Sequence, residues 1–403
     1  MNGTRRENAS TWNWGQVEMN PYSYKWTMYA DAIPLCHGDM DYDTDPRIKD
    51  AILERLSWPL TYPPPYRSSG VAGTISTFYR EAYGLSVPED SLWLGASCLS
   101  QSYQIFTSLV SRGDEVLYWK PAFKYVPGAI EAAGATPIPV PTRADRELVR
   151  ADLESLIGPA TKAVYLVNPH NPTGKVFTTR ELRTISAVAA DHDLLVVSNE
   201  LHCRLVLDGH HIPFASVDAA AARRSITLSG ASKSHNLAGI GGAFAFSLDP
   251  ELLERVRVPA MHRCPEATSI QQAALMAAYS DDSPWLRSTV TRLRQARDRV
   301  CEELTSALPD LALSPPQGTY FLWVDFQPYL REGERAVEVL RSRCGVTVGA
   351  GPGFGGSDSE ARLSFSARED VLRQGIRKIV EGLSERLAAN AVPAATKSDG
   401  TSS

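Results

Sequence analysis

The sequence predicts an α/β sandwich followed by a smaller α+β domain. Two observations in the middle of the chain predict the sandwich. Short apolar runs without polar alternation occur there, which is typical of strands buried on both faces of a parallel sheet. Amphipathic helical patterns such as 179–191 separate these runs, and alternation of this kind is typical of α/β proteins. The candidate strands are 115–119, 136–139, 163–167, 194–198, 225–228 and 243–247.

A long helix is expected to begin after Ser283, which can cap it, with Pro284 in its first turn. Apolar residues then recur at helical spacing at Leu286, Val290, Leu293, Val300 and Leu304. The smaller domain is expected to contain strands 318–325, 346–348 and 361–365, covered by helices around 335–342 and 369–387. The expected division is an arm with part of the small domain (1–50), a large domain (51–285), the small domain (286–390) and a disordered tail (391–403).

Composition excludes several classes of protein. The chain has 403 residues, 43% of them hydrophobic and 22% charged, which is the balance of a globular protein rather than a disordered or collagen-like one. Its 41 basic and 46 acidic residues give a formal net charge of −5, so no basic excess exists to bind nucleic acid. No apolar run reaches the ~20 residues that a membrane helix needs. We therefore expect neither nucleic acid nor a membrane as a partner.

The cysteines and the N-terminal segment indicate the cellular compartment of the protein. Six cysteines are scattered without a CxxC pair, which favours a reducing cytoplasm and argues against a zinc site. The polar N-terminus lacks the apolar core of a secretory signal. Aromatic residues between Trp12 and Tyr29 indicate an arm that packs on something, either a partner subunit or the rim of a substrate entrance.

Three polar segments follow predicted strands. The segment 168–174, NPHNPTG, fixes a turn at the carboxyl end of a strand, where open α/β sheets bind ligands, and Asn171 offers an amide there. The segment 198–202 includes Asn199 and His202. In the segment 229–236, Lys233 stands among small hydroxyl residues that leave room for its amine. Taken singly, each segment is equally compatible with an ordinary turn or a solvated lysine.

Two further features are candidates for binding an anion. Gly95 to Leu99 precede a helical pattern at 101–109, and small residues before a helix leave backbone N–H groups that suit a phosphate, although an ordinary loop with an N-cap explains them as well. Arg362 lies in the predicted strand 361–365; a lone strand arginine is usually a surface charge.

Taken together, in the order in which they occur along the chain, these segments resemble the fold-type I pyridoxal phosphate (PLP) enzymes, the aspartate aminotransferase superfamily. The nearest subgroup resembled is the MalY/PatB-type cystathionine β-lyases. That resemblance rests on Gly38 to Tyr42, on NPTGKV at 171–176, on Glu200 to His202, on HIPF at 211–214, and on Ser232 to Asn236 together with SPWL at 283–286. The resemblance implies a three-layer sandwich with a mostly parallel seven-stranded sheet, PLP as the cofactor and a homodimer with active sites at its interface.

The resemblance also implies roles for individual residues. Lys233 matches the lysine that binds PLP as a Schiff base and then moves protons, and Arg362 matches the clamp on the substrate α-carboxylate. The other expected cofactor-binding residues are Asn171 and His202 at the phenolic oxygen, Phe123 stacked on the ring, Ser97, Cys98 and Ser232 near the phosphate, and Tyr62 at the phosphate of the neighbouring subunit. No metal is expected.

The sequence departs from the family at the cofactor ring and phosphate. Asn199 stands where the family carries an Asp that keeps the ring nitrogen protonated, and a neutral amide cannot supply that countercharge. A tolerated exchange, deliberate tuning and loss of activity are all compatible with this residue. Gly241 replaces a common phosphate-binding arginine, Gly230 a common serine, and Phe123 a commoner tyrosine.

The first choice of reaction is C–S β-elimination from an S-substituted cysteine. The alternatives are transamination, decarboxylation with oxidative deamination of an S-cysteinyl conjugate in a natural-product pathway such as antibiotic biosynthesis, and a regulatory protein that binds PLP without turnover. Lys233 would act as the base in both of the first two reactions. The substrate side chain cannot be predicted from these residues.

Overall fold

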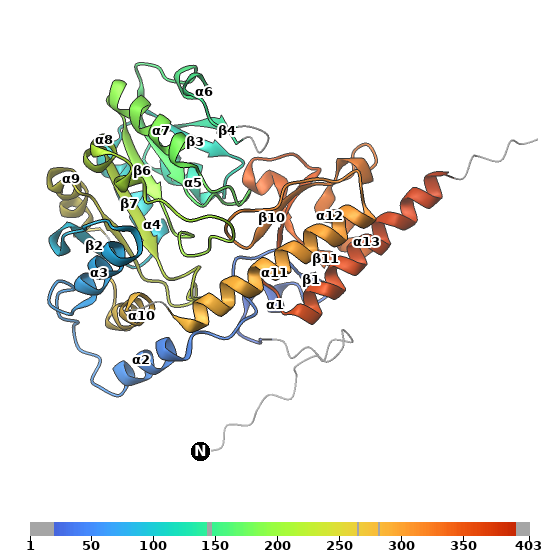
Figure 1. Cartoon of the computed structure of the whole chain (residues 1–403), viewed down its shortest axis with the longest axis horizontal. Helices are drawn as coiled ribbons and strands as arrows, with labels where there is room; N and C mark the ends of the chain where they lie inside the picture. The colour runs from blue at the N-terminus through green and yellow to red at the C-terminus, as the bar shows by residue number, and fades with distance from the viewer. Residues whose placement is uncertain (1–19, 143–146, 264–265, 281–282, 392–403) are drawn as a thin grey trace, which may run out of the picture.

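A helix–sheet–helix sandwich forms the larger part of the molecule (Figure 1). The structure is a computed structural model that describes residues 20–142, 147–263, 266–280 and 283–391. The large sheet has seven strands in the order β2-β8-β7-β6-β5-β3-β4, all parallel except β8. These strands are β2 (Leu92–Gly95), β3 (Glu115–Lys120), β4 (Thr136–Pro141), β5 (Thr161–Val167), β6 (Leu195–Asn199), β7 (Ser225–Gly230) and β8 (Ala243–Phe246).

Both faces of this sheet are buried, which explains the continuous apolar runs. In β5, Ala163 and Tyr165 belong to one core cluster and Val164 and Leu166 to another, because successive side chains point to opposite faces. One face is covered by α4 (Cys98–Leu109), α5 (Tyr125–Ala132) and α9 (Pro250–Ala260), and the other by α6 (Arg150–Glu154), α7 (Thr179–Asp191) and α8 (Ala219–Arg224).

Three further helices pack against the β2–β8 end of the sheet in a third cluster. They are α2 (Pro46–Leu56), α3 (Val71–Tyr83) and α10 (Ser269–Tyr279). The sandwich predicted from the sequence is confirmed, and the strand that the prediction lacked is β2, whose four residues are too short to show a pattern.

A second layered unit contains both chain ends of the described region. Its four-stranded antiparallel sheet has the order β12-β13-β10-β9, and a two-stranded parallel sheet joins β1 to β11. The strands are β1 (Ile33–Pro34), β9 (Ala312–Leu313), β10 (Phe321–Asp325), β11 (Val346–Thr347), β12 (Gly349–Ala350) and β13 (Glu360–Ser364), and the helices are α1 (Tyr24–Met28), α11 (Pro284–Ala307), α12 (Ala336–Cys344) and α13 (Glu369–Ala391).

The long helix α11 crosses from the sandwich to this second unit, where α13 packs beside it (Figure 1). Ser283 caps α11 by accepting a hydrogen bond from the Leu286 N–H group at 3.4 Å, as the sequence predicts. The core of the unit combines side chains of α11, α12 and α13 with Trp26, Leu35 and Met40 from the N-terminal segment. This core is separate from the three clusters around the large sheet. The domain boundaries themselves stay a prediction.

One predicted strand starts later than expected. The sequence suggested a strand over 318–325, but β10 begins at Phe321. Thr319 has a φ of 67°, outside the extended region, and the Gly318 N–H group donates to the Gly174 carbonyl at 2.9 Å. Gly318 instead makes an isolated β-bridge with Val206, and residues 319 and 320 form a bend before β10. Trp12, Trp14 and the tail 392–403 lie outside the described residues.

Within the described ranges, no helix has the length and apolar character needed to cross a bilayer.

Candidate active site

Three of the predicted site segments meet at one edge of the large sheet. Strands β5, β6 and β7 are adjacent and parallel, so their carboxyl ends lie side by side. The 168–174 loop leaves β5, Asn199 ends β6, and Lys233 follows the end of β7 by three residues. The fold thus brings together side chains that are more than 60 residues apart in the sequence.

The amine of Lys233 is held in a buried environment. Its Nζ donates a hydrogen bond to the carbonyl oxygen of Gly38 at 3.0 Å. Burial lowers the pKa of the amine to about 8, with the nearby Arg362 guanidinium contributing in the same direction. A lysine amine with this pKa is partly neutral near neutral pH, as a nucleophile or proton acceptor must be.

The segment that carries Gly38 is fixed to the lysine loop by Asn236. Its Oδ1 accepts from the Met40 N–H group at 2.9 Å, and its Nδ2 donates to the carbonyls of Met40 and Tyr42 at 2.9 and 3.2 Å. The hydroxyl of Tyr320 donates to the same Gly38 carbonyl at 2.7 Å. The acceptor opposite Lys233 is therefore positioned from two sides.

Arg362 points into the same site rather than into solvent. It comes from β13, and its guanidinium lies between the rings of Phe321 and Phe354, 3.8 and 4.6 Å from their centroids. Nη1 donates to Oδ1 of Asn171 at 3.0 Å and Nη2 donates to the Cys36 carbonyl at 2.9 Å. Burial lowers the pKa of this guanidinium to about 10, so it stays cationic near neutral pH.

His202 is a neutral imidazole in this site. Burial lowers its pKa to about 3, with Lys233 and Arg362 adding to the effect. Its ring meets Tyr320 and Phe321 edge-on at 6.0 and 6.1 Å. Its Nδ1 is buried and has no hydrogen-bond partner among the described residues.

Asn199 is held by two hydrogen bonds within the chain. Its Oδ1 accepts from the Leu201 N–H group at 3.2 Å, and its Nδ2 donates to the hydroxyl of Tyr165 at 3.2 Å. The Tyr165 hydroxyl also contacts Oγ of Ser102 at 2.7 Å. Asn199, which stands where the family has Asp, therefore has a hydrogen-bond partner at each end of its amide.

The predicted anion-binding residues lie where α4 begins. Ser97 is the N-cap, and its Oγ accepts from the Ser100 N–H group at 3.1 Å. Cys98 is buried, its thiol donates to the Ser229 carbonyl at 3.4 Å, and burial raises its pKa to about 12. Cys98 is therefore an un-ionised thiol.

The backbone of Gly241 and Gly242 packs against the residues that precede α4. The Gly242 N–H group donates to the Ala96 carbonyl at 2.7 Å, and a Cβ at Gly241 would stand 2.7 Å from that oxygen. A glycine is therefore required at 241, where the family often has arginine. Ser232 is half-buried beside Lys233.

Phe123 is near the site, and Tyr62 is not brought to it by its own chain. The ring of Phe123 lies 6.0 Å from that of Phe354, which packs on Arg362. The side chain of Tyr62 is 99% exposed. The role expected for Tyr62 in a neighbouring subunit stays a prediction.

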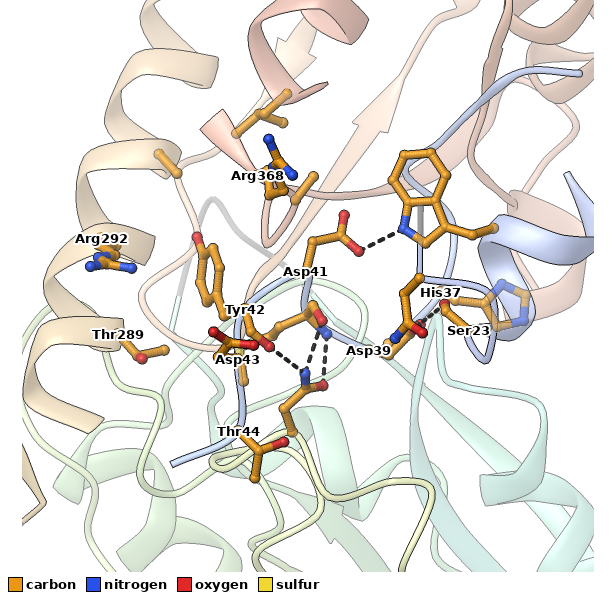
Figure 2. A pocket seen from close by; sticks show the side chains of 18 of the residues that line it. Ser23, His37, Asp39, Asp41, Tyr42, Asp43, Thr44, Thr289, Arg292 and Arg368 are labelled. Atoms are coloured by element: carbon orange, nitrogen blue, oxygen red, sulfur yellow. Dashed lines mark hydrogen bonds between the residues drawn. The ribbon is translucent and has the colours of Figure 1, made fainter. Parts of the chain in front are cut away.

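A cavity of about 2010 Å³ opens beside Lys233 and Asn236. Figure 2 shows Asp39, Asp41 and Asp43 on the N-terminal segment and Arg292 on α11, all of them among the residues that line the cavity. Ser23 Oγ donates to Asp39 and Trp26 Nε1 donates to Asp41, each at 2.8 Å, as the dashed lines in Figure 2 mark. The predicted arm thus contributes its described part, α1, to the cavity wall.

Sequence reasoning missed several residues of the site. Tyr320, Phe321 and Phe354 pack around Arg362 and His202, Tyr165 accepts from Asn199, and Ser102 contacts Tyr165. The strand register that places Trp323 opposite Arg362, and Phe321 opposite Ser364, depends on pairing between residues about 40 positions apart in the sequence. The pattern of these segments alone contains no signal for that pairing.

The residues present fit PLP. The buried Lys233 amine suits a Schiff base, and the helix N-terminus capped by Ser97 suits a phosphate. His202 Nδ1 and Arg362 Nε are buried polar atoms without a hydrogen-bond partner in the described part of the chain, as expected of groups that await a ligand.

Comparison with known proteins gives a consistent result. Residues 30–379 match the family described as aminotransferase class I and II. The chain is 28% identical to cystathionine β-lyase PatB of Bacillus subtilis (88% of this chain, 93% of PatB) and 26% identical to an aspartate aminotransferase of Bacillus sp. strain YM-2 (87% and 91%).

Among solved structures, a protein of Corynebacterium diphtheriae assigned as a PLP-dependent β-cystathionase superposes with a TM-score of 0.83. It is 25% identical to this chain, and the match covers 90% of this chain and 96% of that one. The chain has the fold-type I architecture and PLP is its cofactor. The protein therefore belongs to the aminotransferase class I and II family, as a PLP-dependent enzyme of the C–S lyase and aminotransferase kind.

Proposed function

We propose that the enzyme catalyses C–S β-elimination from an S-substituted cysteine. The observation that carries the proposal is the placement of Lys233, whose buried amine lines the open cavity within reach of the Gly38 carbonyl. This arrangement supplies a base and room for a substituent on the substrate sulfur. The similarity to cystathionine β-lyase PatB favours the same reaction.

The carboxylate of the substrate would be bound by Arg362. Its guanidinium keeps N–H groups beyond the two already used, and Nε has no partner among the described residues. Two parallel hydrogen bonds from a planar fork fix both the position and the rotation of a carboxylate. Arg362 would therefore determine which bond at Cα faces Lys233.

The residues that would hold PLP are Lys233, Asn171, His202, Phe123, Asn199, Ser97, Cys98 and Ser232. When bound, PLP supplies an electron sink for the bond that is broken at Cα. Lys233 would take the Cα proton, because its amine is partly neutral near neutral pH. The electron pair of that C–H bond then displaces the thiolate from Cβ. With one water consumed, the products are the thiol, pyruvate and ammonium.

The cavity beside Lys233 would receive the substituent on the substrate sulfur. It is open to solvent, and Lys233 is the predicted site residue that lies in its described lining. Its wall carries both signs of charge, with Asp39, Asp43, Arg292 and Arg368 among the lining residues. A polar substituent would find hydrogen-bond partners there, whereas a purely aliphatic one would leave charged groups desolvated.

Transamination is the second candidate, because the chain is also 26% identical to an aspartate aminotransferase. Both reactions begin with removal of the Cα proton, and they differ in whether the C–S bond breaks. Product analysis by mass spectrometry on a panel of S-substituted cysteines separates them. Thiol with pyruvate supports elimination, and a keto acid that keeps its sulfur supports transamination. Carbon dioxide release with oxygen uptake would indicate oxidative decarboxylation, and an absence of any product would indicate a regulatory protein.

A homodimer is part of the proposal. Large apolar side chains between Leu53 and Tyr62 lie exposed in succession, including Trp58 at 67%. An exposed apolar segment of this kind marks a contact surface. A second copy would cover it and would receive Tyr62 at its phosphate site.

The five cysteines of the described residues are unpaired and buried, which suits a reducing compartment such as the cytoplasm.

A further inference from the structure

The Asn199 amide is held in one orientation by backbone groups at both ends of a hydrogen-bond chain. At one end, the Leu201 N–H group can only donate, so the atom of Asn199 that faces it at 3.2 Å must be the carbonyl oxygen. At the other end, Oγ of Ser102 donates to the Cys98 carbonyl at 2.8 Å, and a carbonyl can only accept.

The direction of the bonds between these ends follows. Ser102 has one hydroxyl hydrogen, which the Cys98 carbonyl takes, so the Tyr165 hydroxyl must donate to Ser102 across their 2.7 Å contact. The Tyr165 oxygen is then an acceptor toward Asn199, whose Nδ2 donates to it at 3.2 Å. If the Asn199 amide were flipped, its Nδ2 group would face the Leu201 N–H group, and two donors would oppose each other. Asn199 is thus fixed as a donor with one Nδ2 hydrogen to spare.

In the described part of the chain, the hydrogen-bond partners of the Asn199 side chain are the uncharged Tyr165 hydroxyl and Leu201 N–H group. The adjacent carboxylate, Glu200, is buried and fully engaged: Oε1 accepts from Ser198 Oγ and the Phe214 N–H group, and Oε2 pairs with His211, each at 2.9 Å. Lys233 and Arg362 place positive charge in the same site. A further buried cation there would be disfavoured by these positive charges.

We propose that Asn199 donates a hydrogen bond to the ring nitrogen of PLP and keeps this nitrogen unprotonated, with Tyr165 and Ser102 as positioning residues. The proposal rests on PLP being bound with its ring nitrogen toward the end of β6, and it holds for elimination and transamination alike. An unprotonated ring withdraws electrons less strongly than a pyridinium. The site would therefore favour a reaction in which charge at Cα is discharged at once, as it is when a thiolate leaves.

The test is the nitrogen NMR shift of the enzyme reconstituted with PLP labelled with ¹⁵N in its ring. Wild type is expected to show the shift of an unprotonated, hydrogen-bonded pyridine that does not change between pH 6 and pH 8. Asn199→Asp, which has the same shape and a charge, is expected to show the shift of a protonated ring. Tyr165→Phe, which removes the acceptor for Nδ2, is expected to move the signal toward a pyridine without a hydrogen bond.

A protonated ring in wild type would overturn the proposal, and this result needs no variant to fold. An unchanged shift in Tyr165→Phe would overturn the positioning role of Tyr165. Because the shift is read without substrate, an unprotonated ring in an enzyme that does not cleave C–S bonds would sustain this inference and refute the proposed elimination.

Discussion

Lys233 and Gly38, 195 residues apart in the sequence, are joined by a hydrogen bond of 3.0 Å from the lysine amine to the glycine carbonyl. Tyr320 donates to the same carbonyl at 2.7 Å, and Asn236 fixes the segment that follows it. The position of the amine is therefore set jointly by the loop after β7 and by the N-terminal segment.

Removing the amine is expected to abolish the reaction. Lys233→Ala should lower kcat by at least about 10²–10⁴-fold, the usual contribution of a positioned base, and should eliminate the visible absorption band of covalently bound PLP. The absorption spectrum and the steady-state rate are the measurements. Added methylamine should restore part of the rate; a variant that retains full turnover would show that another group is the base.

The close approach at Gly38 gives a steric test. A Cβ at this position would lie 3.0 Å from Lys233 Nζ and 3.3 Å from Phe321 Cζ, so Gly38→Ala should displace the amine and lower kcat with little change in melting temperature. Gly239→Ala is the matched control, because nothing lies within 4 Å of an added Cβ there. Equal rates for both variants would contradict the positioning role of Gly38.

Substitution of Arg362 separates charge from geometry. Arg362→Lys keeps a cation between Phe321 and Phe354 but loses the planar fork, so affinity for amino acids should fall by about 10- to 100-fold, the value of one charged hydrogen bond. Spectral titration with an S-substituted cysteine measures the Kd. The corresponding amino alcohol, which lacks the carboxylate, should bind wild type and variant alike. A variant that loses affinity for both compounds equally would contradict the proposed carboxylate contact.

The buried amine predicts a pH dependence of stability in the enzyme without PLP. Burial lowers the pKa of Lys233 from 10.5 to about 8, so between these values the unfolded chain binds a proton that the folded protein does not. Unfolding free energy should therefore rise with pH from about 8 to about 10.5, relative to Lys233→Met, and the difference between the two should be constant below pH 8. Urea unfolding at a series of pH values measures this; parallel curves throughout would show an amine with an ordinary pKa.

The exposed segment from Leu53 to Tyr62 predicts both assembly and cofactor affinity. Trp58→Asp should weaken the dimer, as measured by light scattering, because it places a charge on the apolar contact surface. Tyr62→Phe should leave the dimer intact and raise the Kd for PLP by about tenfold or more, since one hydrogen bond to a phosphate is lost. A monomeric wild-type enzyme with full PLP affinity would refute both expectations.

The sequence predicted those parts of the fold that depend on local pattern. The buried strand β5 appears where a continuous apolar run predicts it, α7 where the amphipathic pattern predicts it, and α11 where the capping residue Ser283 predicts its start. Residues 318–320 differ from the predicted strand, because backbone hydrogen bonds to Gly174 and Leu205, which are distant in the sequence, hold them in a bend.

The site was predictable only in part, for the same reason. Asn171 and Lys233 follow strands, and Asn199 ends one, whose carboxyl ends must meet in a parallel sheet, so the proximity of these residues follows from the fold class. The contact of Arg362 with Asn171 depends on how the second unit packs against the first, and its contacts with Phe321 and Phe354 depend on strand pairing and loop packing within the second unit. No local pattern encodes that packing, and the Ser102–Tyr165–Asn199 chain likewise joins three separate elements.

The most direct test of the proposed elimination is a paired time course of thiol and pyruvate from L-cystathionine and a series of larger S-substituted cysteines, with no keto acid added. Wild type is expected to release the two products in equal amounts from at least one substrate, and Lys233→Ala to release neither. Turnover that requires a keto acid and leaves the C–S bond intact would contradict the proposed elimination.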